Sequence, residues 1–213
     1  MECVRLQVFT AALMVSSLLA GVSAFGQTSQ EWADCLTGNL NTPDVPIEGC
    51  TAVIKTGEHI LRRLASAYNN RGVAYRVKAN YAQAIDDFNE AIRLEPKFAN
   101  AFNNRGVAYR NTGDLDRALA DYNQAISIKP DYYAAFYNRG LALTDKQEYA
   151  KAIADFTTVL HDDPKNPLVL YRRGVALLKS GAIDAGNADL AAAKPIKPDI
   201  EELIREGGPE AGP

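Results

Sequence analysis

A period of 34 residues runs through most of this 213-residue chain and constrains its fold more than any other feature. Three kinds of residue keep this spacing: an Arg-Gly pair, a proline and an aspartate. The positions are Arg71-Gly72, Arg105-Gly106, Arg139-Gly140 and Arg173-Gly174, then Pro96, Pro130, Pro164 and Pro198, then Asp87, Asp121, Asp155 and Asp189. Such regularity predicts supersecondary units stacked along one axis, because a single short unit cannot bury its apolar face alone.

The residues around these positions resemble the tetratricopeptide repeat (TPR), whose pattern is W-x2-L-G-x2-Y, then A-x3-F, then P. Its slots are filled by Tyr68, Gly72, Tyr75, Ala84, Phe88 and Pro96, by Phe102, Gly106, Tyr109, Ala118, Tyr122 and Pro130, by Phe136, Gly140, Leu143, Ala152, Phe156 and Pro164, and by Leu170, Gly174, Leu177, Leu190 and Pro198. The resemblance implies an all-α solenoid of helix-turn-helix repeats. Arginine replaces the usual leucine before each glycine.

The first unit shows why this pattern forms two packed helices. We expect one helix from Ala65 to about Lys78 and a second from Tyr81 to about Leu94. Small residues at Gly72 and Ala84 let the two backbones approach closely, while aromatic residues fill the space around them. Pro96 then ends the second helix, because a proline disfavours helical geometry in the residue before it.

The units differ in how closely they follow the pattern. In the last one, Gly186 takes the alanine slot and Pro195 comes near the end of the second helix, as in a degenerate closing repeat. Before the first, residues 46–54 echo 84–92 and indicate a divergent helix pair in which Cys50 takes the slot of Phe88. The predicted organisation is an export signal at 1–24, the divergent pair at 25–64, repeats at 65–98, 99–132, 133–166 and 167–200, and the end of a capping helix with a disordered tail at 201–213.

The start of the chain is typical of a secretory signal. Arg5 precedes an apolar stretch that ends in the small residues Val22-Ser23-Ala24. We predict cleavage after Ala24, with an uncleaved membrane anchor as the alternative. The repeat sequences, with Asn-Asn-Arg-Gly, resemble those of bacterial TPR proteins. The cysteine-containing amino-terminal segment is similar to that of exported TPR proteins from Gram-negative bacteria. This resemblance implies a periplasmic or secreted protein.

Two cysteines remain after the predicted cleavage, Cys35 and Cys50. Oxidising compartments favour a disulfide between them. Free buried thiols and a metal site are the alternatives, although the only histidines, His59 and His161, supply no matching set of ligands. A disulfide would replace aromatic packing at the end of the solenoid, where a unit has only one neighbour.

Charge and motifs argue against two broad classes of function. A net charge of -3 offers no general attraction to nucleic acid or to anionic lipid, so we expect no nucleic-acid partner and no membrane contact after signal cleavage. Phosphate-binding loops, metalloprotease motifs and nucleophile elbows are missing from the sequence, which predicts a protein that is not an enzyme and needs no cofactor.

The repeated arginine and aspartate have a structural and a functional interpretation. Arg71 lies on a first helix and Asp87 lies 16 residues later on the antiparallel second helix. That spacing can bring the two charges together within a unit or between units, and the same holds in the other three units. We favour structural ion pairs over a ladder of charges that binds a ligand.

Binding is better sought on the other face of each first helix, which lines the concave groove of TPR solenoids. Four cations and one anion, Asp145, fall on this face. A neutral to acidic protein or extended peptide is therefore the expected partner. The predicted peptide-binding residues are Asn70, Asn104, Asn138, Arg76, Arg110, Tyr137, Tyr171 and Arg172.

Two family comparisons bear on this groove. TPR domains that clamp the carboxyl terminus of chaperones use Lys and Asn in fixed slots, where this chain has Asn69 and Val73, so that clamp is not supported. Asn70, Asn104 and Asn138 resemble the asparagine ladder of O-linked N-acetylglucosamine transferases, which holds a peptide backbone. The alternative is that asparagine is simply a common polar residue at this slot.

The sequence thus predicts a non-catalytic protein-interaction module, acting in the assembly or maintenance of a cell-envelope complex. Two alternatives remain: a structural scaffold that self-associates through its terminal repeats, and a non-catalytic subunit of an enzyme complex. The oligomeric state and the identity of the partner do not follow from the sequence.

Overall fold

The computed structural model describes residues 29–36, 41–56 and 60–205. The predicted export signal at 1–24, His59 and the predicted tail after residue 205 lie outside these ranges. Apart from a helical stretch at 29–36, the helices are α2 (Asp44–Lys55), α3 (Leu61–Val77), α4 (Tyr81–Leu94), α5 (Ala99–Asn111), α6 (Leu115–Ile128), α7 (Tyr133–Asp145), α8 (Tyr149–Asp162), α9 (Pro167–Lys179), α10 (Ile183–Ala193) and α11 (Ile200–Arg205).

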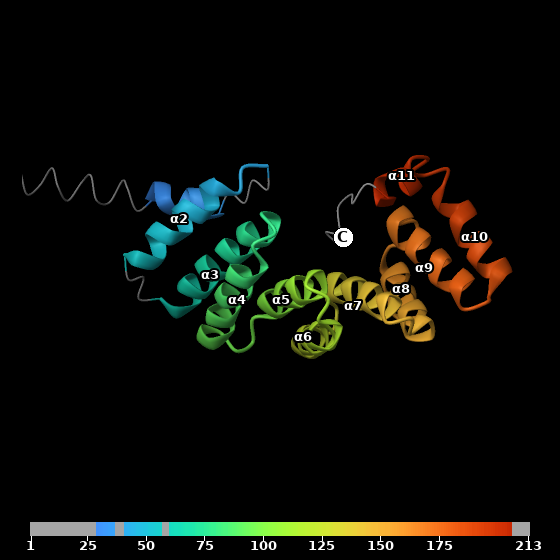
Figure 1. The fold of residues 1–213 in the computed structure, drawn as a ribbon, viewed down its shortest axis with the longest axis horizontal. Helices are drawn as coiled ribbons and strands as arrows, with labels where there is room; N and C mark the ends of the chain where they lie inside the picture. The colour runs from blue at the N-terminus through green and yellow to red at the C-terminus, as the bar shows by residue number, and fades with distance from the viewer. Residues whose placement is uncertain (1–28, 37–40, 57–59, 206–213) are drawn as a thin grey trace, which may run out of the picture.

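Consecutive helices pack as antiparallel pairs, and the pairs stack into a curved solenoid (Figure 1). The first helices of the pairs, α3, α5, α7 and α9, contact one another in order. In the described ranges, contacts between alternate helices are found among these four and not among α4, α6, α8 and α10, so the first helices form the inner side of the curve; α6 and α10 are visible on the outer side in Figure 1. The predicted all-α solenoid is confirmed, including the divergent pair before α3 and the short closing helix α11.

Helix boundaries follow the predicted ones closely. Helix α4 occupies the predicted range, and α3 begins one turn earlier than expected, at Leu61. Each turn between the paired helices holds one residue with positive φ, at Ala79, Gly113, Gln147 and Gly181. The amide of the next residue donates to a carbonyl five residues earlier in all four turns, which satisfies groups that the helix end leaves unpaired.

The small residues of the pattern lie where predicted, against a large side chain of the facing helix. A Cβ atom added to Gly72, Gly106 or Gly140 would lie 2.7 Å from the ring at position 88, 122 or 156. These rings, Phe88, Tyr122 and Phe156, are fully buried. Each of these three repeats therefore has a core in which a ring of the second helix fills the space left by a glycine of the first.

In the last pair, two helices approach through a second glycine. A Cβ atom on Gly186 would lie 2.9 Å from the carbonyl oxygen of Gly174 and 2.7 Å from Leu178. The alanine slot of this unit therefore has no room for alanine. This unit has Leu190 in the slot where the other repeats have an aromatic ring. Because the smaller leucine lets α9 and α10 pack more closely, the alanine slot holds glycine.

A disulfide joins the helical stretch 29–36 to α2. Cys35 and Cys50 are bonded, with their Cα atoms 4.5 Å apart and both side chains fully buried. The predicted alignment of this pair with the repeats also holds, because Thr51 accepts a hydrogen bond from Arg71 as Asn89 does from Arg105. The divergent pair therefore stacks on α3 in the register of a repeat.

Candidate interaction face

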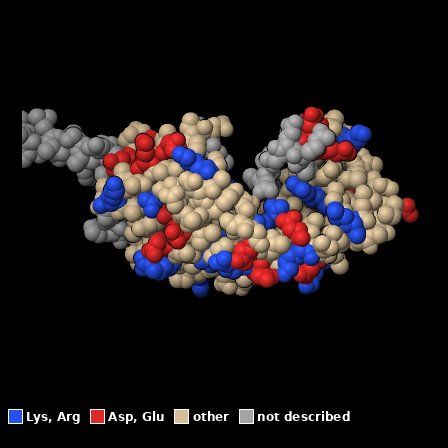
Figure 2. All heavy atoms as spheres, in the orientation of Figure 1, with Lys and Arg blue, Asp and Glu red and all other residues tan. Residues whose placement is uncertain are grey.

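The inner side of the arch is one continuous surface made by the same helix of four units. Residues 34 positions apart lie on successive first helices, so a side chain at one slot forms a row along the solenoid. Figure 2 shows this side as a hollow between the amino-terminal and carboxyl-terminal limbs. We call it the concave face, and it carries the residues predicted to bind a peptide.

The asparagines of the predicted ladder bond to neighbouring units. Asn104 donates from Nδ2 to Oδ1 of Asn69 at 3.0 Å, and Asn138 donates to Asn103 at 2.9 Å. Asn70 donates to the carbonyl oxygen of Cys35 at 3.2 Å. These amides thus tie each first helix to the preceding unit, a role that the sequence analysis did not assign to them.

Two residues of the predicted site are buried. Tyr137 has no exposed surface and packs its ring against Phe156, with the ring centroids 5.9 Å apart. Including it among the ligand contacts was wrong, because its slot turns into the seam between units. Asn138 is 5% exposed and its amide is engaged with Asn103, so we also leave it out of the contact set.

The positive charge of the concave face is partly neutralised. Arg110 donates to Asp145 at 2.6 Å, and this ion pair links α5 to α7. Asp145, the one anion predicted on this face, therefore neutralises one of the four predicted cations. Arg76 is half-buried on α3. On α9, Lys179 is exposed, and the Nε atom of Arg172 is buried with no hydrogen-bond partner in the part of the chain that the structure describes.

Tyr171 and its neighbours give the α9 part of the face an apolar character. Leu168 and Tyr171 are partly buried against the core of the last units, and Val175 and Leu178 are also partly exposed. The corresponding slots on α3 hold Ser66, Asn69, Val73 and Arg76, of which only Val73 is apolar. The concave face therefore changes along the arch, from amide and hydroxyl groups near α3 to an apolar and basic surface near α9.

The repeated Arg–Asp pairs are structural, as favoured from the sequence. Each arginine donates Nε and Nη2 to the two carboxylate oxygens of the aspartate 16 residues later, at 2.7 to 2.9 Å. The pairs are Arg71–Asp87, Arg105–Asp121, Arg139–Asp155 and Arg173–Asp189. These carboxylates are 5 to 8% exposed, which keeps them from an external ligand.

The ion pairs shift the pKa values of their members. Hydrogen bonding to the partner aspartate raises the pKa of Arg71, Arg105 and Arg173, against the opposing effect of burial. Burial raises the pKa of Asp87, and the bond to Arg71 only partly offsets this. The cost of burying a carboxylate is thus the larger effect on the pKa of Asp87, even with the arginine bonded to it.

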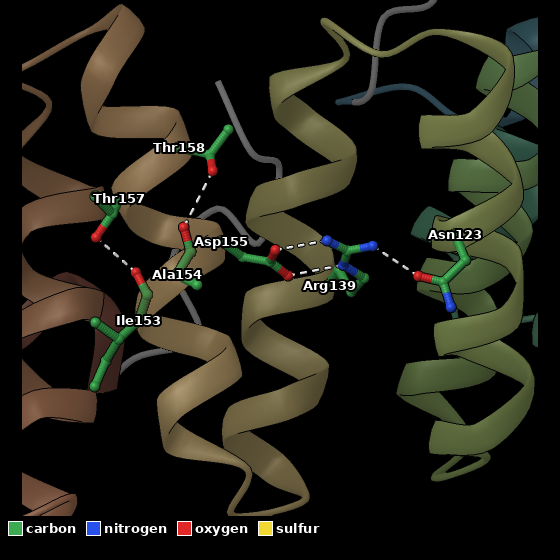
Figure 3. Close-up of polar contacts among 7 residues, drawn as sticks. All are labelled: Asn123, Arg139, Ile153, Ala154, Asp155, Thr157 and Thr158. Carbon is green, nitrogen blue, oxygen red and sulfur yellow. Dashed lines mark hydrogen bonds and ion pairs between the residues drawn. The ribbon is translucent and has the colours of Figure 1, made fainter.

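Each arginine also reaches the unit before its own. Arg139 donates Nη1 to Asn123 at 2.7 Å and so extends from α7 to both α8 and α6 (Figure 3). The corresponding bonds run from Arg71 to Thr51, from Arg105 to Asn89 and from Arg173 to Thr157. The sequence pattern contained this signal, since 89 and 123 are both asparagine at the repeat spacing.

The described ranges hold no group of three or more His, Cys, Asp or Glu residues able to bind a metal ion. His161 is exposed at the end of α8. Of the helices in the same ranges, none is both long and apolar enough to cross a membrane.

The fold and the concave face together define a class of protein, the α-solenoids built from stacked helix pairs that offer an extended surface to other proteins. Within that class, the family model "Tetratricopeptide repeat" matches residues 65–98 and 99–132, and the model "TPR repeat" matches 140–181. These matches cover about half of the chain. The chain belongs to the TPR family, whose members are protein-interaction modules.

Solved structures of similar fold are also TPR proteins, and no curated protein sequence matches the chain. A structure of MamA has a TM-score of 0.66 at 19% identity, covering 88% of this chain and 98% of that one. YrrB, "a TPR protein with an unusual peptide-binding site", has a TM-score of 0.63 at 21% sequence identity, and the match covers 81% of this chain and 87% of YrrB. A tetratricopeptide repeat protein from Parabacteroides merdae has a TM-score of 0.69 at 20% sequence identity, and the match covers 84% of this chain and 69% of that one.

Proposed function

We propose that this protein is a non-catalytic binding module that holds an extended peptide along its concave face. One observation carries the proposal: the same helix of four successive units lines this face, so equivalent side chains recur in a row. An extended peptide also repeats its backbone groups at a regular interval. The likeness to YrrB, which is described as having a peptide-binding site, supports a peptide as the ligand.

The contacts that we propose differ along the groove. Asn70 and Asn104 are partly exposed, and each uses one of its two amide N–H donors within the protein, so each retains hydrogen-bonding capacity for a peptide backbone. On α9, Tyr171 offers a ring and Arg172 a guanidinium whose buried Nε has no acceptor among the described residues. A carboxylate or carbonyl of the ligand would satisfy that donor once the side chain turns outward, which fits a neutral to acidic peptide.

The test first identifies the ligand and then measures its affinity. A photo-crosslinking amino acid at Tyr171 should capture a partner segment in cells, whereas the same residue at Gln124, exposed on α6, should not. A synthetic peptide of that segment is then titrated. We expect Arg172→Gln with Lys179→Gln to weaken binding about tenfold and to reduce its salt dependence.

A matched control has the same change in net charge. Lys165→Gln with Lys197→Gln alters two exposed lysines outside the concave face. It should leave the affinity within about twofold of the wild type, since exposed charges away from a binding site act weakly. Equal losses for the two double variants would refute the concave face as the site.

We further propose that the protein acts outside the cytoplasm, in the assembly or maintenance of an envelope complex. The disulfide supports this, because such bonds persist in oxidising compartments. The intact mass of protein from a periplasmic fraction tests the export step: it should correspond to a chain that begins at Phe25 and lacks two thiol hydrogens. A mass that includes Met1 would favour a retained anchor instead.

A self-associating scaffold is the second candidate, and exposed apolar side chains favour it. In the described ranges, Leu36, Val45, Ile60 and Leu61 are 43 to 61% exposed near the amino-terminal end of the stack, and Ile183 is 53% exposed in the last unit. Contact between opposite ends would cover both sets. Light scattering over a range of concentrations separates the candidates, since a scaffold grows in mass with concentration and a peptide binder stays monomeric.

A further inference from the structure

The outer side carries a hollow between α6 and α8, with α7 as its floor. Its volume is about 440 Å³, within the range of small-ligand sites. Its lining combines an apolar floor with charged walls. The lining residues are Leu119, Asn123, Arg139, Leu143, Glu148, Lys151, Ala154 and Asp155. None of these residues belongs to the proposed peptide groove, so the hollow is a separate feature of the molecule.

The preceding repeat shows what fills the equivalent space. There the slot of Leu143 holds Tyr109, and the slot of Lys151 holds Arg117. The guanidinium carbon of Arg117 lies 4.4 Å from the centre of the Tyr109 ring, and Tyr109 is 8% exposed. A phenol ring covered by a cation thus occupies that space, and the next repeat has leucine and lysine in the same two slots.

Two substitutions between the repeats open the hollow. Leu143 lacks the ring and the hydroxyl group of Tyr109, so a smaller, apolar side chain lines the floor of the hollow. Lys151 bonds to Glu148 at 2.6 Å, as Arg117 bonds to Asp114 at the same distance, but lysine lacks the planar guanidinium that Arg117 places over Tyr109. The hollow is therefore the space of a missing aromatic ring and its cation.

We propose that this hollow binds an aromatic side chain, tyrosine by preference, from a protein partner. The ring would lie on Leu143 in the place that Tyr109 takes one repeat earlier. Arg139 and Lys151 border the space, and cations attract the negative face of an aromatic ring. An aliphatic side chain would gain only apolar contact with Leu119 and Leu143. The site lies on the opposite side of the solenoid from the peptide groove and would serve a second contact with a partner.

The experiment is a titration of the full-length mature protein with N-acetyl-tyrosinamide, in which amide NMR spectra report binding. We expect resonances of Leu143, Lys151 and Ala154 to shift with a Kd of the order of a millimolar, as for other ligands of this size. N-acetyl-leucinamide, the matched aliphatic probe, should bind more weakly by about two- to fivefold, because it lacks the cation–π attraction.

A filled-in variant distinguishes this site from general surface binding. Leu143→Tyr with Lys151→Arg restores the residues of the preceding repeat, so it should weaken the binding of the tyrosine probe about tenfold or more. Leu177→Tyr makes the same change at the same slot one repeat later and should leave the Kd unchanged. Thermal melts confirm that each variant is folded.

Other outcomes would overturn the proposal. They are equal affinity for the tyrosine and leucine probes, undiminished binding to the filled-in variant, and shifts confined to the concave face. Should the filled-in variant lose helicity, Lys151→Glu takes its place. That change removes one cation from an exposed side chain, and it should weaken tyrosine binding about two- to fivefold without affecting leucine binding. Equal effects on the two probes count against the site.

Discussion

Arg139 offers the sharpest test of how the ion pairs stabilise the stacked repeats. It donates two hydrogen bonds to Asp155, at 2.8 and 2.7 Å, and one to Asn123 in the preceding repeat at 2.7 Å. Arg139→Met keeps most of the aliphatic stem but removes all three bonds. Asp155, which is 5% exposed, would then be a buried carboxylate without its cation.

The expected magnitude follows from that burial. Removing one partner of a buried ion pair typically costs 3–5 kcal/mol of unfolding free energy. The side chain of Arg139 is 23% exposed, so water can reach part of the site, and we expect about 2–3 kcal/mol. Asn123→Ala removes only the bond between repeats at an exposed acceptor, and it should cost about 0.5–1 kcal/mol.

Urea denaturation followed by circular dichroism measures both variants. The double variant Arg139→Met with Asp155→Leu should be more stable than the sum of its single changes predicts, by roughly 1–2 kcal/mol, since no unpaired charge is left. In thermal melts, Arg139→Met should unfold roughly 4–12 °C below the wild type. If Arg139→Met cost no more than Asn123→Ala, the argument from the buried carboxylate would fail.

Three further predictions address packing, pH and the disulfide. Gly106→Leu should destabilise by more than about 3 kcal/mol because a Cβ atom there meets a ring at 2.7 Å, whereas Gly181→Ala, at φ 91° in open space, should cost about 1–2 kcal/mol; similar melts would contradict the assigned packing. Burial raises the pKa of Tyr132 in the folded protein. The contribution of the neutral tyrosine to stability is therefore complete below the ordinary tyrosine pKa near 10, and it is lost as pH rises through the pKa of the folded state. Tyr132→Phe should therefore lose less stability in urea between about pH 8 and 11 than the wild type, and an equal loss refutes this. Reducing Cys35–Cys50, which closes a span of 15 residues, should cost about 3 kcal/mol and speed hydrogen exchange in α2 but not in α7.

The repeat pattern was sufficient to predict the fold because each of its slots has one dominant physical role. A glycine at position 72 of the chain has to face a bulky ring, and Phe88 at the expected spacing supplies it. The Arg71–Asp87 pair follows in the same way, since two antiparallel helices bring residues 16 apart to the same level. Such local pairings depend on helix geometry alone.

The groove was harder to predict because its composition depends on the rotation between successive units. Helical periodicity places Asn69, Asn103 and Tyr137 on the inner side of their own helices, and it does not say how far the next helix covers them. In the structure these side chains are at most 7% exposed, because the following first helix closes over the slot. A polar slot of one unit thus becomes a seam between two units.

The same seam links the stacking of the repeats to the chemistry of the groove. Two successive seams are closed by an asparagine pair, Asn69 with Asn104 and Asn103 with Asn138. At the next seam the equivalent slots hold Tyr137 and Arg172. The tyrosine ring is taken into the core, and the guanidinium of Arg172 is left with a buried Nε that has no acceptor in the described part of the chain. An unpaired donor of this kind is costly, and that cost would be removed if the Arg172 side chain turned outward to an acceptor on a ligand. The break in the asparagine pairing therefore makes α9 the part of the concave face where a bound peptide has the most to gain, and a substitution at Arg172 should affect affinity more than one at Asn70 or Asn104.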